Sequence, residues 1–363
     1  MKAKASAALQ ALPEGVLRPA DYERHARAAL PPQAWDYFSA HAGDGHTARA
    51  NAAAWDAIAL LPRVLRDLRG VDTRTELLGR SLPWPVLVAP MALQRLAHPD
   101  GERAMALAAS ALGAGFVLGS QASMSIESVA AAFEPAAGRG PFWFQLYLLP
   151  DRGATMALVR RAEAAGCEAL VLTVDAAVRT ARRLQLPPGV GTVNLPDDAC
   201  PPGSLQELLA RAPTWDDVAW LRSQTRLPLL LKGVLHPADA REAVRQGVDG
   251  LIVSNHGGRV LDGAAATAAA LPGIVDAVAG SVPLVVDGGI RQGTDVLKAL
   301  ALGARAVLVG RPVLWGLATA GAAGAAHVLR LLRDELELAM AQCGAGSLAE
   351  LSRDVLQADS HRV

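Results

Sequence analysis

This chain of 363 residues has few cysteines and no net charge. Cys167, Cys200 and Cys343 are odd in number, far apart and without CxxC spacing, which indicates a reducing compartment rather than a disulfide framework or a metal site. Lys and Arg balance Asp and Glu at 35 each, so the basic charge that is typical of nucleic-acid-binding proteins is missing. We therefore expect neither a metal nor a nucleic-acid partner.

Long hydrophobic runs are also missing. The N-terminus, MKAKASAALQALPEG, has no apolar core of signal-peptide length before Pro13 and Glu14. The stretch nearest to a membrane span, Gly316 to Leu329, is mostly Gly and Ala, contains His327 and is too short to cross a bilayer. These observations predict a cytoplasmic protein with no membrane partner.

After residue 80 the chain alternates short apolar runs with Ala-rich amphipathic segments. The eight runs are near-continuously apolar, as expected of parallel strands that are covered on both faces. They are Val86–Pro90, Phe116–Gly119, Phe142–Leu148, Ala169–Asp175, Pro228–Lys232, Gly250–Asn255, Pro283–Asp287 and Ala306–Gly310. Helix-like stretches between them include Gly101–Leu112, Arg152–Ala165, Pro237–Gln246 and Gly293–Leu302. Eight strand-then-helix units predict an α/β fold, a (β/α)8 TIM barrel.

A single domain accounts for the whole chain. We expect an N-terminal helical segment at 1–80, the barrel at 81–345 and a C-terminal tail at 346–363. In the first segment, Asp21 to Leu30 predicts a helix that Pro31 and Pro32 end, and Gln33 to His41 predicts another. A doubly wound fold is the alternative, but Pro90 is followed by Met91-Ala-Leu-Gln and not by the G-x-G-x-x-G turn that such folds use.

One interval, from Asp175 to Pro228, is longer than the others. It contains a turn-rich piece at 186–191 and ends in Trp215–Arg222, which has a helical pattern. In a barrel this interval is the fourth βα loop on the catalytic face, where long loops are usually lids or specificity elements.

Polar residues follow most of the predicted strands. In a barrel, side chains just past the carboxyl end of a strand point into the active site. In strand order from the third to the eighth, these residues are Gln145 and Tyr147; Thr173 and Asp175; Lys232; Ser254, Asn255, His256 and Arg259; Asp287 and Arg291; Gly310 and Arg311. A lone strand-end Asp is more often a helix cap, and a lone Tyr is usually part of the core. Their convergence from six strands on one rim favours a site.

Two glycine-rich turns predict a phosphate site. Asp287-Gly-Gly-Ile-Arg-Gln-Gly follows the seventh strand and Gly310-Arg-Pro follows the eighth, where barrels commonly bind phosphate. Glycines let backbone N–H groups approach an anion, and Arg291 and Arg311 can hold it bidentately. Two tight barrel turns alone would not require two arginines.

Four of these side chains suggest a chemical role. Lys232 fits either a cation beside the electron-rich edge of a flavin or a Schiff-base lysine. His256 can act as a base near neutral pH, and Asp175 can stabilise the imidazolium that forms. Arg259, past two glycines, can pair with a substrate carboxylate as a planar fork.

From about Asp21 to Ser352 the chain resembles the FMN-dependent 2-hydroxy-acid oxidases and dehydrogenases, the family of glycolate oxidase, lactate oxidase and mandelate dehydrogenase. The motifs that carry the resemblance are Ser254-Asn-His-Gly-Gly-Arg with Leu261-Asp262, Asp287-Gly-Gly-Ile-Arg-Gln-Gly-Thr-Asp, Ala301-Leu-Gly-Ala-Arg-Ala-Val-Leu-Val-Gly-Arg-Pro and Leu170-Val-Leu-Thr-Val-Asp. The resemblance implies FMN as cofactor, oxidation of an L-2-hydroxy acid to the 2-oxo acid with O2 as the expected acceptor, and a homotetramer.

The resemblance also implies a role for each matching residue. His256 would be the base with Asp175 as its partner, Arg259 and Arg182 would clamp the substrate carboxylate, and Tyr37 and Tyr147 would contact substrate. FMN would be held by Pro90, Met91, Ala92, Gly119, Gln145, Thr173, Lys232, Ser254, Asp287, Gly288, Gly289, Arg291, Gly310 and Arg311. His256 would remove the hydroxyl or α-carbon proton while two electrons pass to flavin N5, by a hydride or a carbanion route.

Departures from the family pattern lie around the substrate. Gln121 stands where short-chain glycolate oxidases have an aromatic residue, Gly119 replaces a serine or threonine, and His41 replaces a glycine. Ala176-Ala177 replaces Thr-Pro, and Arg179-Thr-Ala-Arg182-Arg183 replaces Leu-Gly-Arg-Arg, so Arg179 and Arg183 are alternatives to Arg182. The fourth loop is also shorter than is typical and lacks a membrane-anchoring insert. We expect the chemistry to be retained and the substrate to be larger than glycolate.

Three other functions compete with an oxidase. A dehydrogenase of the same family would pass electrons to a quinone or another acceptor. An FMN barrel isomerase or an NAD(P)H-fed reductase would not need His256 and Arg259. A binding protein that retains FMN without turnover would not need His256, Asp175, Tyr147 and Arg259 together, and their presence argues against it.

Overall fold

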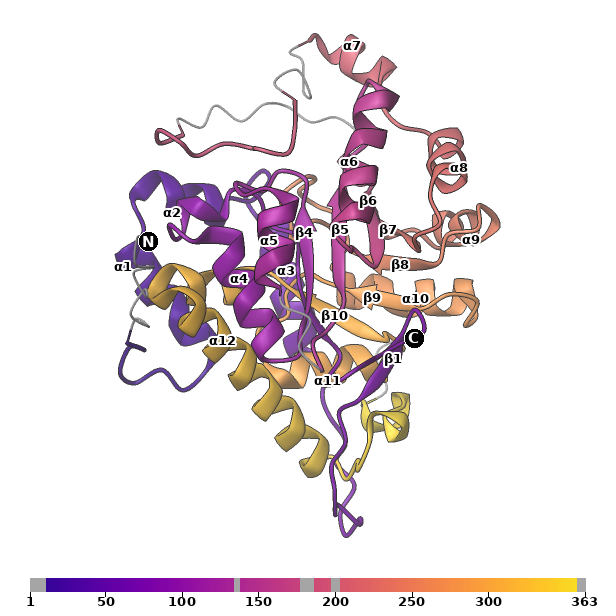
Figure 1. Cartoon of the computed structure of the whole chain (residues 1–363). Helices are drawn as coiled ribbons and strands as arrows, with labels where there is room; N and C mark the ends of the chain where they lie inside the picture. The colour runs from indigo at the N-terminus through magenta and orange to yellow at the C-terminus, as the bar shows by residue number, and fades with distance from the viewer. Residues whose placement is uncertain (1–10, 134–137, 177–185, 197–202, 358–363) are drawn as a thin grey trace.

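The computed structural model describes residues 11–133, 138–176, 186–196 and 203–357. Eight parallel strands close into a barrel in the order β3 to β10, with β10 paired to β3 (Figure 1). The strands are β3 (Val86–Val88), β4 (Gly115–Gly119), β5 (Phe142–Leu146), β6 (Ala169–Thr173), β7 (Leu229–Val234), β8 (Gly250–Val253), β9 (Leu284–Val286) and β10 (Ala306–Val309). Each predicted apolar run overlaps one strand, so the (β/α)8 prediction is confirmed.

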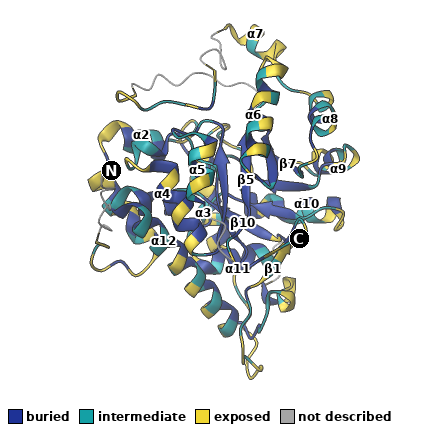
Figure 2. Ribbon diagram, viewed as in Figure 1, coloured by how far each residue is buried: buried dark blue, intermediate teal, exposed yellow. Residues whose placement is uncertain are grey.

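Helices surround the barrel and leave its strands buried (Figure 2). They are α4 (Gly101–Ala111), α5 (Ile126–Ala132), α6 (Arg152–Ala164), α7 (Leu205–Ala210), α8 (Trp215–Gln224), α9 (Pro237–Arg245), α10 (Thr267–Val278), α11 (Gly293–Ala301) and α12 (Arg311–Gln342). Short 3-10 turns lie at Pro19–Asp21, Gln94–Leu96, Leu348–Glu350 and Arg353–Val355. The four helices predicted between strands and the one predicted at 215–222 match within two residues at each end.

The inside of the barrel is a packed apolar core. Alternate strand residues point inward and form one cluster, including Leu87, Val117, Trp143 and Leu230, while their neighbours pack outward against the helices. This alternation is why both faces of each strand have to be apolar. A two-stranded hairpin, β1 (Thr75–Leu77) and β2 (Arg80–Leu82), adds Leu77 and Leu82 to the inner cluster.

The N-terminal segment is helical over α1 (Tyr22–Ala29), α2 (Pro32–Ser39) and α3 (His46–Asp56). The hairpin at its end was not predicted. The helix predicted over Asp21 to Leu30 is α1, which ends at Ala29 before Pro31 and Pro32 as predicted, and Pro32 is also the first residue of α2. Proline suits that position because the first N–H of a helix has no intrahelical partner.

Helix α12 is longer than the 316–329 stretch suggested. By length and composition alone it could cross a membrane, so the expectation that no segment is long enough is wrong. Two-thirds (67%) of its most apolar window is buried inside the molecule, where the helix packs on α4, α11 and α1. Non-helical dihedral angles at Ala320 and Gly321 divide it into two pieces.

Candidate active site

His256 and Asp175 meet at the carboxyl ends of the barrel strands. His256 lies three residues past β8 and Asp175 two residues past β6, and His256 Nδ1 is 3.0 Å from Asp175 Oδ1. Burial by itself raises the pKa of Asp175, but the His256 hydrogen bond and the charges of Lys232 and His256 outweigh it, so the pKa is lowered. The ionised carboxylate selects the tautomer with its proton on Nδ1, which leaves Nε2 as an acceptor.

The turn that carries His256 has an unusual backbone. His256, Gly257 and Gly258 have positive φ angles of 58°, 64° and 74°. Glycine adopts this region freely, whereas a histidine there is strained by about 1–3 kcal/mol. Strain of this kind persists only where the surroundings hold it, which is consistent with a functional position.

Lys232 is a buried cation held by a carboxylate. Its side chain is 5% exposed, and its Nζ lies 3.1 Å from Asp287 Oδ2 and donates to Ser254 Oγ at 2.8 Å. Burial lowers the pKa of Lys232, but the charges of Asp287 and Asp175 outweigh it and raise the pKa. A Schiff-base lysine has to be neutral to attack a carbonyl, so this environment favours the cationic role.

At the opening formed by the carboxyl ends of the strands, β3 to β6 carry an amide side chain and small residues. Gln145 Nε2 donates to Thr173 Oγ1 at 2.9 Å. A Cβ at Gly119 would lie 3.3 Å from Gln145 Oε1 and 3.8 Å from Pro90 Cβ, so a serine or threonine there would crowd Gln145 and contact Pro90. On the neighbouring strand, a Cβ at Gly310 would lie 3.7 Å from Met91 Sδ, so the predicted cofactor residues of β3, β4 and β10 lie close together.

Three guanidinium groups gather beside strands β8 to β10. Burial, followed by the charges of Arg259 and Arg291, lowers the pKa of Arg311 to about 10, with Glu23 acting in the opposite direction. Burial also lowers the pKa of Arg291. Arg311 is the first residue of α12 and follows Gly310 directly, so the positive end of a helix dipole adds to this cluster. An anion would relieve this repulsion, as expected of the predicted phosphate site.

The glycines after Asp287 are required for packing as well as for the approach of an anion. Gly288 and Gly289 have φ angles of 88° and 90°, and a Cβ at Gly289 would lie 2.4 Å from the backbone oxygen of Asn51 in α3. Only glycine fits between this turn and the helix. The predicted reason, approach of backbone N–H groups to a phosphate, is therefore incomplete.

The C-terminal end of α2 brings two of the predicted substrate contacts, Tyr37 and Arg259, together. Arg259 donates to the backbone oxygens of Tyr37, Phe38 and Ala40 at 3.0–3.1 Å, and its guanidinium lies 5.6 Å from the centre of the Tyr37 ring. Arg311 donates to Phe38 O and Ala40 O as well. Cations are favoured at the negative end of a helix dipole.

The remaining predicted substrate residues differ in how far the structure places them. Tyr147 follows β5, and its interaction with Lys232 raises the pKa of that lysine. Gln121 follows β4, where its backbone oxygen accepts from Leu93 N at 3.2 Å. Its side-chain amide makes no hydrogen bond within the described part of the chain. Arg182 and its alternatives Arg179 and Arg183 lie outside the described residues.

Residues of α3 support the catalytic loops and were not predicted. Asn51 and Asn255 exchange side-chain hydrogen bonds of 2.8 and 2.7 Å, and Trp55 Nε1 donates to Gly288 O at 2.8 Å. Asp262, which belongs to a recognised motif, accepts from Thr47 N at 2.8 Å at the start of α3. The Asn51–Asn255 pair joins residues 204 positions apart and left no signal in the sequence.

The site fits FMN by its donors and acceptors. Three buried side-chain oxygens near the mouth, Asp175 Oδ2, Asp287 Oδ1 and Ser120 Oγ, have no hydrogen-bond partner among the described residues. Each such atom costs about 1–3 kcal/mol unless a ligand or water satisfies it. Hydroxyl and imide donors of a flavin nucleotide would satisfy such acceptors, and its phosphate would pair with Arg291 and Arg311. No group of metal-ligating side chains occurs in the described ranges.

Comparisons with known proteins agree with this geometry. Residues 26–358 match the model of the FMN-dependent dehydrogenase family. An L-lactate oxidase from Alicycliphilus denitrificans is 47% identical over 95% of this chain and 97% of its own length. A peroxisomal (S)-2-hydroxy-acid oxidase from Oryza sativa subsp. japonica is 46% identical over 94% and 96%.

Among solved structures, mandelate oxidase with (S)-2-phenylpropionate is 44% identical and superimposes with a TM-score of 0.85, covering 94% of this chain and 98% of that chain. The resemblance inferred from the sequence motifs is therefore confirmed, and so is FMN as cofactor. The chain belongs to the FMN-dependent dehydrogenase family and is an FMN-dependent oxidoreductase of 2-hydroxy acids.

Proposed function

We propose that this chain oxidises an L-2-hydroxy acid to the 2-oxo acid and passes the electrons to O2, which yields H2O2. The observation that carries the proposal is the His256–Asp175 pair at 3.0 Å on the rim of the barrel. The oxidase names of the relatives support O2 as acceptor over a quinone. An isomerase or reductase has no need of this pair.

The mechanism assigns a task to each side chain. Bound FMN supplies a two-electron acceptor. His256 Nε2 takes a proton from the substrate, and the charge of Asp175 stabilises the imidazolium that results. Arg259 and Tyr37 bind and orient the carboxylate, because both lie at the C-terminal end of α2 beside the mouth. Lys232, fixed by Asp287, presents a permanent positive charge next to the site.

We further propose that the preferred substrate is larger than glycolate. Gln121 stands in place of an aromatic side chain, and its amide is not tied to another described side chain, so it leaves room above the site. Each methylene buried there adds about 0.8 kcal/mol, and 1.4 kcal/mol corresponds to about tenfold in specificity. Two extra methylenes therefore favour the longer acid by on the order of tenfold.

The test is anaerobic bleaching of the bound flavin by glycolate, L-lactate, 2-hydroxyoctanoate and L-mandelate. The proposal expects faster bleaching by the larger acids and rapid return of the yellow colour when air is admitted. Slow return in air, with rapid return on adding a quinone, would favour the dehydrogenase. If glycolate is the best of the four substrates, the proposed substrate size is wrong.

A Gln121→Trp variant tests the pocket directly. It should lower the preference for 2-hydroxyoctanoate over glycolate by about tenfold, because the indole fills the space that the alkyl chain would occupy. The homotetramer stays a prediction from the family resemblance, and the cytoplasmic location stays a prediction from the sequence. Light scattering of the purified protein measures the oligomeric state.

A further inference from the structure

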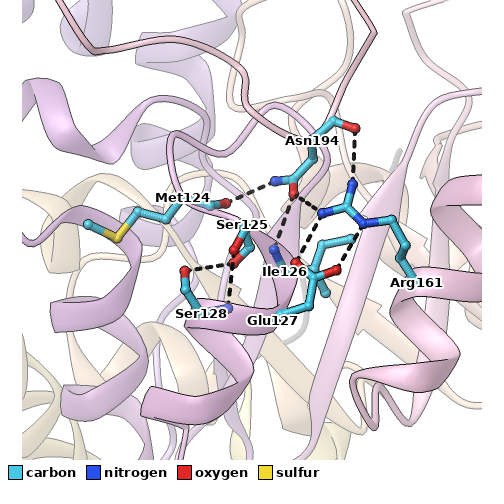
Figure 3. A network of polar contacts seen from close by, with 7 residues as sticks. All are labelled: Met124, Ser125, Ile126, Glu127, Ser128, Arg161 and Asn194. Carbon is cyan, nitrogen blue, oxygen red and sulfur yellow. Dashed lines mark hydrogen bonds and ion pairs between the residues drawn. The ribbon is translucent and has the colours of Figure 1, made fainter.

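The Asn194 side chain, in the loop between β6 and α7, makes three hydrogen bonds, two to the start of α5 and one to Arg161 in α6 (Figure 3). Its Oδ1 accepts from Ile126 N at 3.1 Å and from Arg161 Nη2 at 3.0 Å. Its Nδ2 donates to Met124 O at 2.9 Å. The residue is 5% exposed, so solvent cannot replace these partners.

The amide of Asn194 has a single favourable orientation. Two donors face its oxygen and one acceptor faces its nitrogen. Arg161 is itself fixed, because Nε and Nη2 form a fork on the carboxylate of Glu127 at 2.9 and 3.1 Å. The side chain is therefore a fixed link between the loop and the segment that leads into α5.

That segment carries Gln121 and is also tied down from the other side. Glu102, fully buried in α4, accepts from Ser123 N at 2.8 Å and from Ser123 Oγ. Arg95 N donates to Ser123 Oγ, and the Arg95 guanidinium donates to Gly189 O in the same loop as Asn194. The turn from Gly119 to α5 is thus held between α4 and the fourth βα loop.

We propose that Asn194 is a positioning residue for substrate selection, because it fixes the turn that carries Gln121 relative to the fourth βα loop. It contacts neither the His256–Asp175 pair nor the arginine cluster in the described structure. Its loss should therefore change how substrates of different length bind and not the chemical step. The inference rests on the proposed function, in which the region around Gln121 selects substrate size.

The experiment uses the FMN-loaded enzyme with Asn194→Ala, Asn194→Asp and, as a matched control, Glu127→Gln. The aspartate can still accept from Ile126 N and Arg161 but cannot donate to Met124 O. The control weakens the Arg161–Glu127 pair and leaves the contacts of Asn194 with Ile126 N and Met124 O. Anaerobic rapid mixing gives a substrate dissociation constant and a limiting rate of flavin reduction for glycolate and for 2-hydroxyoctanoate.

For Asn194→Ala we expect the dissociation constant of the preferred acid to rise by roughly fivefold or more, the scale of one or more lost hydrogen bonds. The limiting rate of flavin reduction should change by less than about twofold, because the lost interaction stabilises the bound substrate and the transition state equally. The ratio of the two dissociation constants should move toward one, whichever acid the unmodified enzyme prefers. Asn194→Asp should show a smaller shift in the same direction, and Glu127→Gln should stay within about twofold of the unmodified enzyme.

Hydrogen exchange of a peptide over 122–128 gives a readout that is independent of turnover. It should speed up in Asn194→Ala and not in Glu127→Gln, because the Ile126 amide loses its acceptor only in the former. An unchanged ratio of dissociation constants would overturn the proposal, as would an equal loss of binding and limiting rate for both acids. If Asn194→Ala does not fold, the result for Asn194→Asp decides. A preference of the unmodified enzyme for glycolate would contradict the proposed substrate size but leave this test intact.

Discussion

Replacing Asp175 with asparagine tests the core of the mechanism. The change keeps the shape of the side chain but removes the charge that faces His256 Nδ1 at 3.0 Å. Lys232 still has Asp287 at 3.1 Å, so we expect the variant to fold and to bind FMN. What is lost is the electrostatic stabilisation of the imidazolium.

The geometry sets the size of the effect. Two unit charges about 4 Å apart interact by about 4 kcal/mol at an effective dielectric constant of ~20, which is an upper bound here. Loss of about 2.7 kcal/mol slows the step by roughly 10²-fold. We therefore expect substrate at saturation to reduce the flavin about 10²-fold more slowly in the Asp175→Asn variant than in the unmodified enzyme. Flavin reduction in the His256→Ala variant should be at least as slow.

Titration of Asp175 itself should add no pH dependence to this effect in the neutral range. The folded pKa of Asp175 lies below its ordinary value of about 3.9, so its charge is present above that value and is lost only as the pH falls through the lowered folded pKa. Titration of Asp175 therefore does not change the ratio between the flavin reduction rates of the unmodified enzyme and the Asp175→Asn variant above about pH 5. Anaerobic stopped-flow spectroscopy measures the rates. Flavin reduction within about threefold of the unmodified enzyme would refute the assigned role.

Three further changes probe the binding groups. Arg259→Lys should raise the KM for 2-hydroxy acids by about tenfold or more, because an ammonium group does not reproduce a bidentate fork; an unchanged KM would move the clamp elsewhere. Lys232→Met should lower the free energy of unfolding of the apoprotein, measured by urea titration, by roughly 3–5 kcal/mol, because Asp287 is left buried and unpaired. The double variant Lys232→Met/Asp287→Asn should recover part of this free energy. FMN at about 100 times its Kd should stabilise the apoprotein by about 2.7 kcal/mol, and Arg311→Gln should remove most of this stabilisation in a thermal melt at the same FMN concentration.

The barrel could be predicted because its strands are apolar on both faces. Runs such as 169–175 and 250–255 are too continuous for a half-exposed strand and too short for a helix. The hairpin β1–β2 was missed because its strands have only three residues each. The extent of α12 was missed because a Gly- and Ala-rich sequence does not show where a helix begins when packing, and not local pattern, sets its limits.

The predicted site residues that the structure describes could be found for a geometrical reason. Carboxyl ends of parallel strands meet on one rim of a barrel, so His256 and Asp175, 81 positions apart, could be expected side by side. The residues on the substrate side of the site were harder to predict from the sequence. Asn194 hydrogen-bonds to the start of α5, a contact between loops that no strand register specifies.

The N-terminal helices are part of the catalytic apparatus in this fold. The His256 turn has a strained backbone, and such strain persists only where neighbouring groups hold it. Asn51 in α3 holds Asn255 just before His256, and Asp262 caps α3 from just beyond the same turn. The loop therefore stabilises the start of the helix while the helix stabilises the loop. Disruption of either should weaken both, so the extension and the catalytic rim are expected to unfold as one cooperative unit.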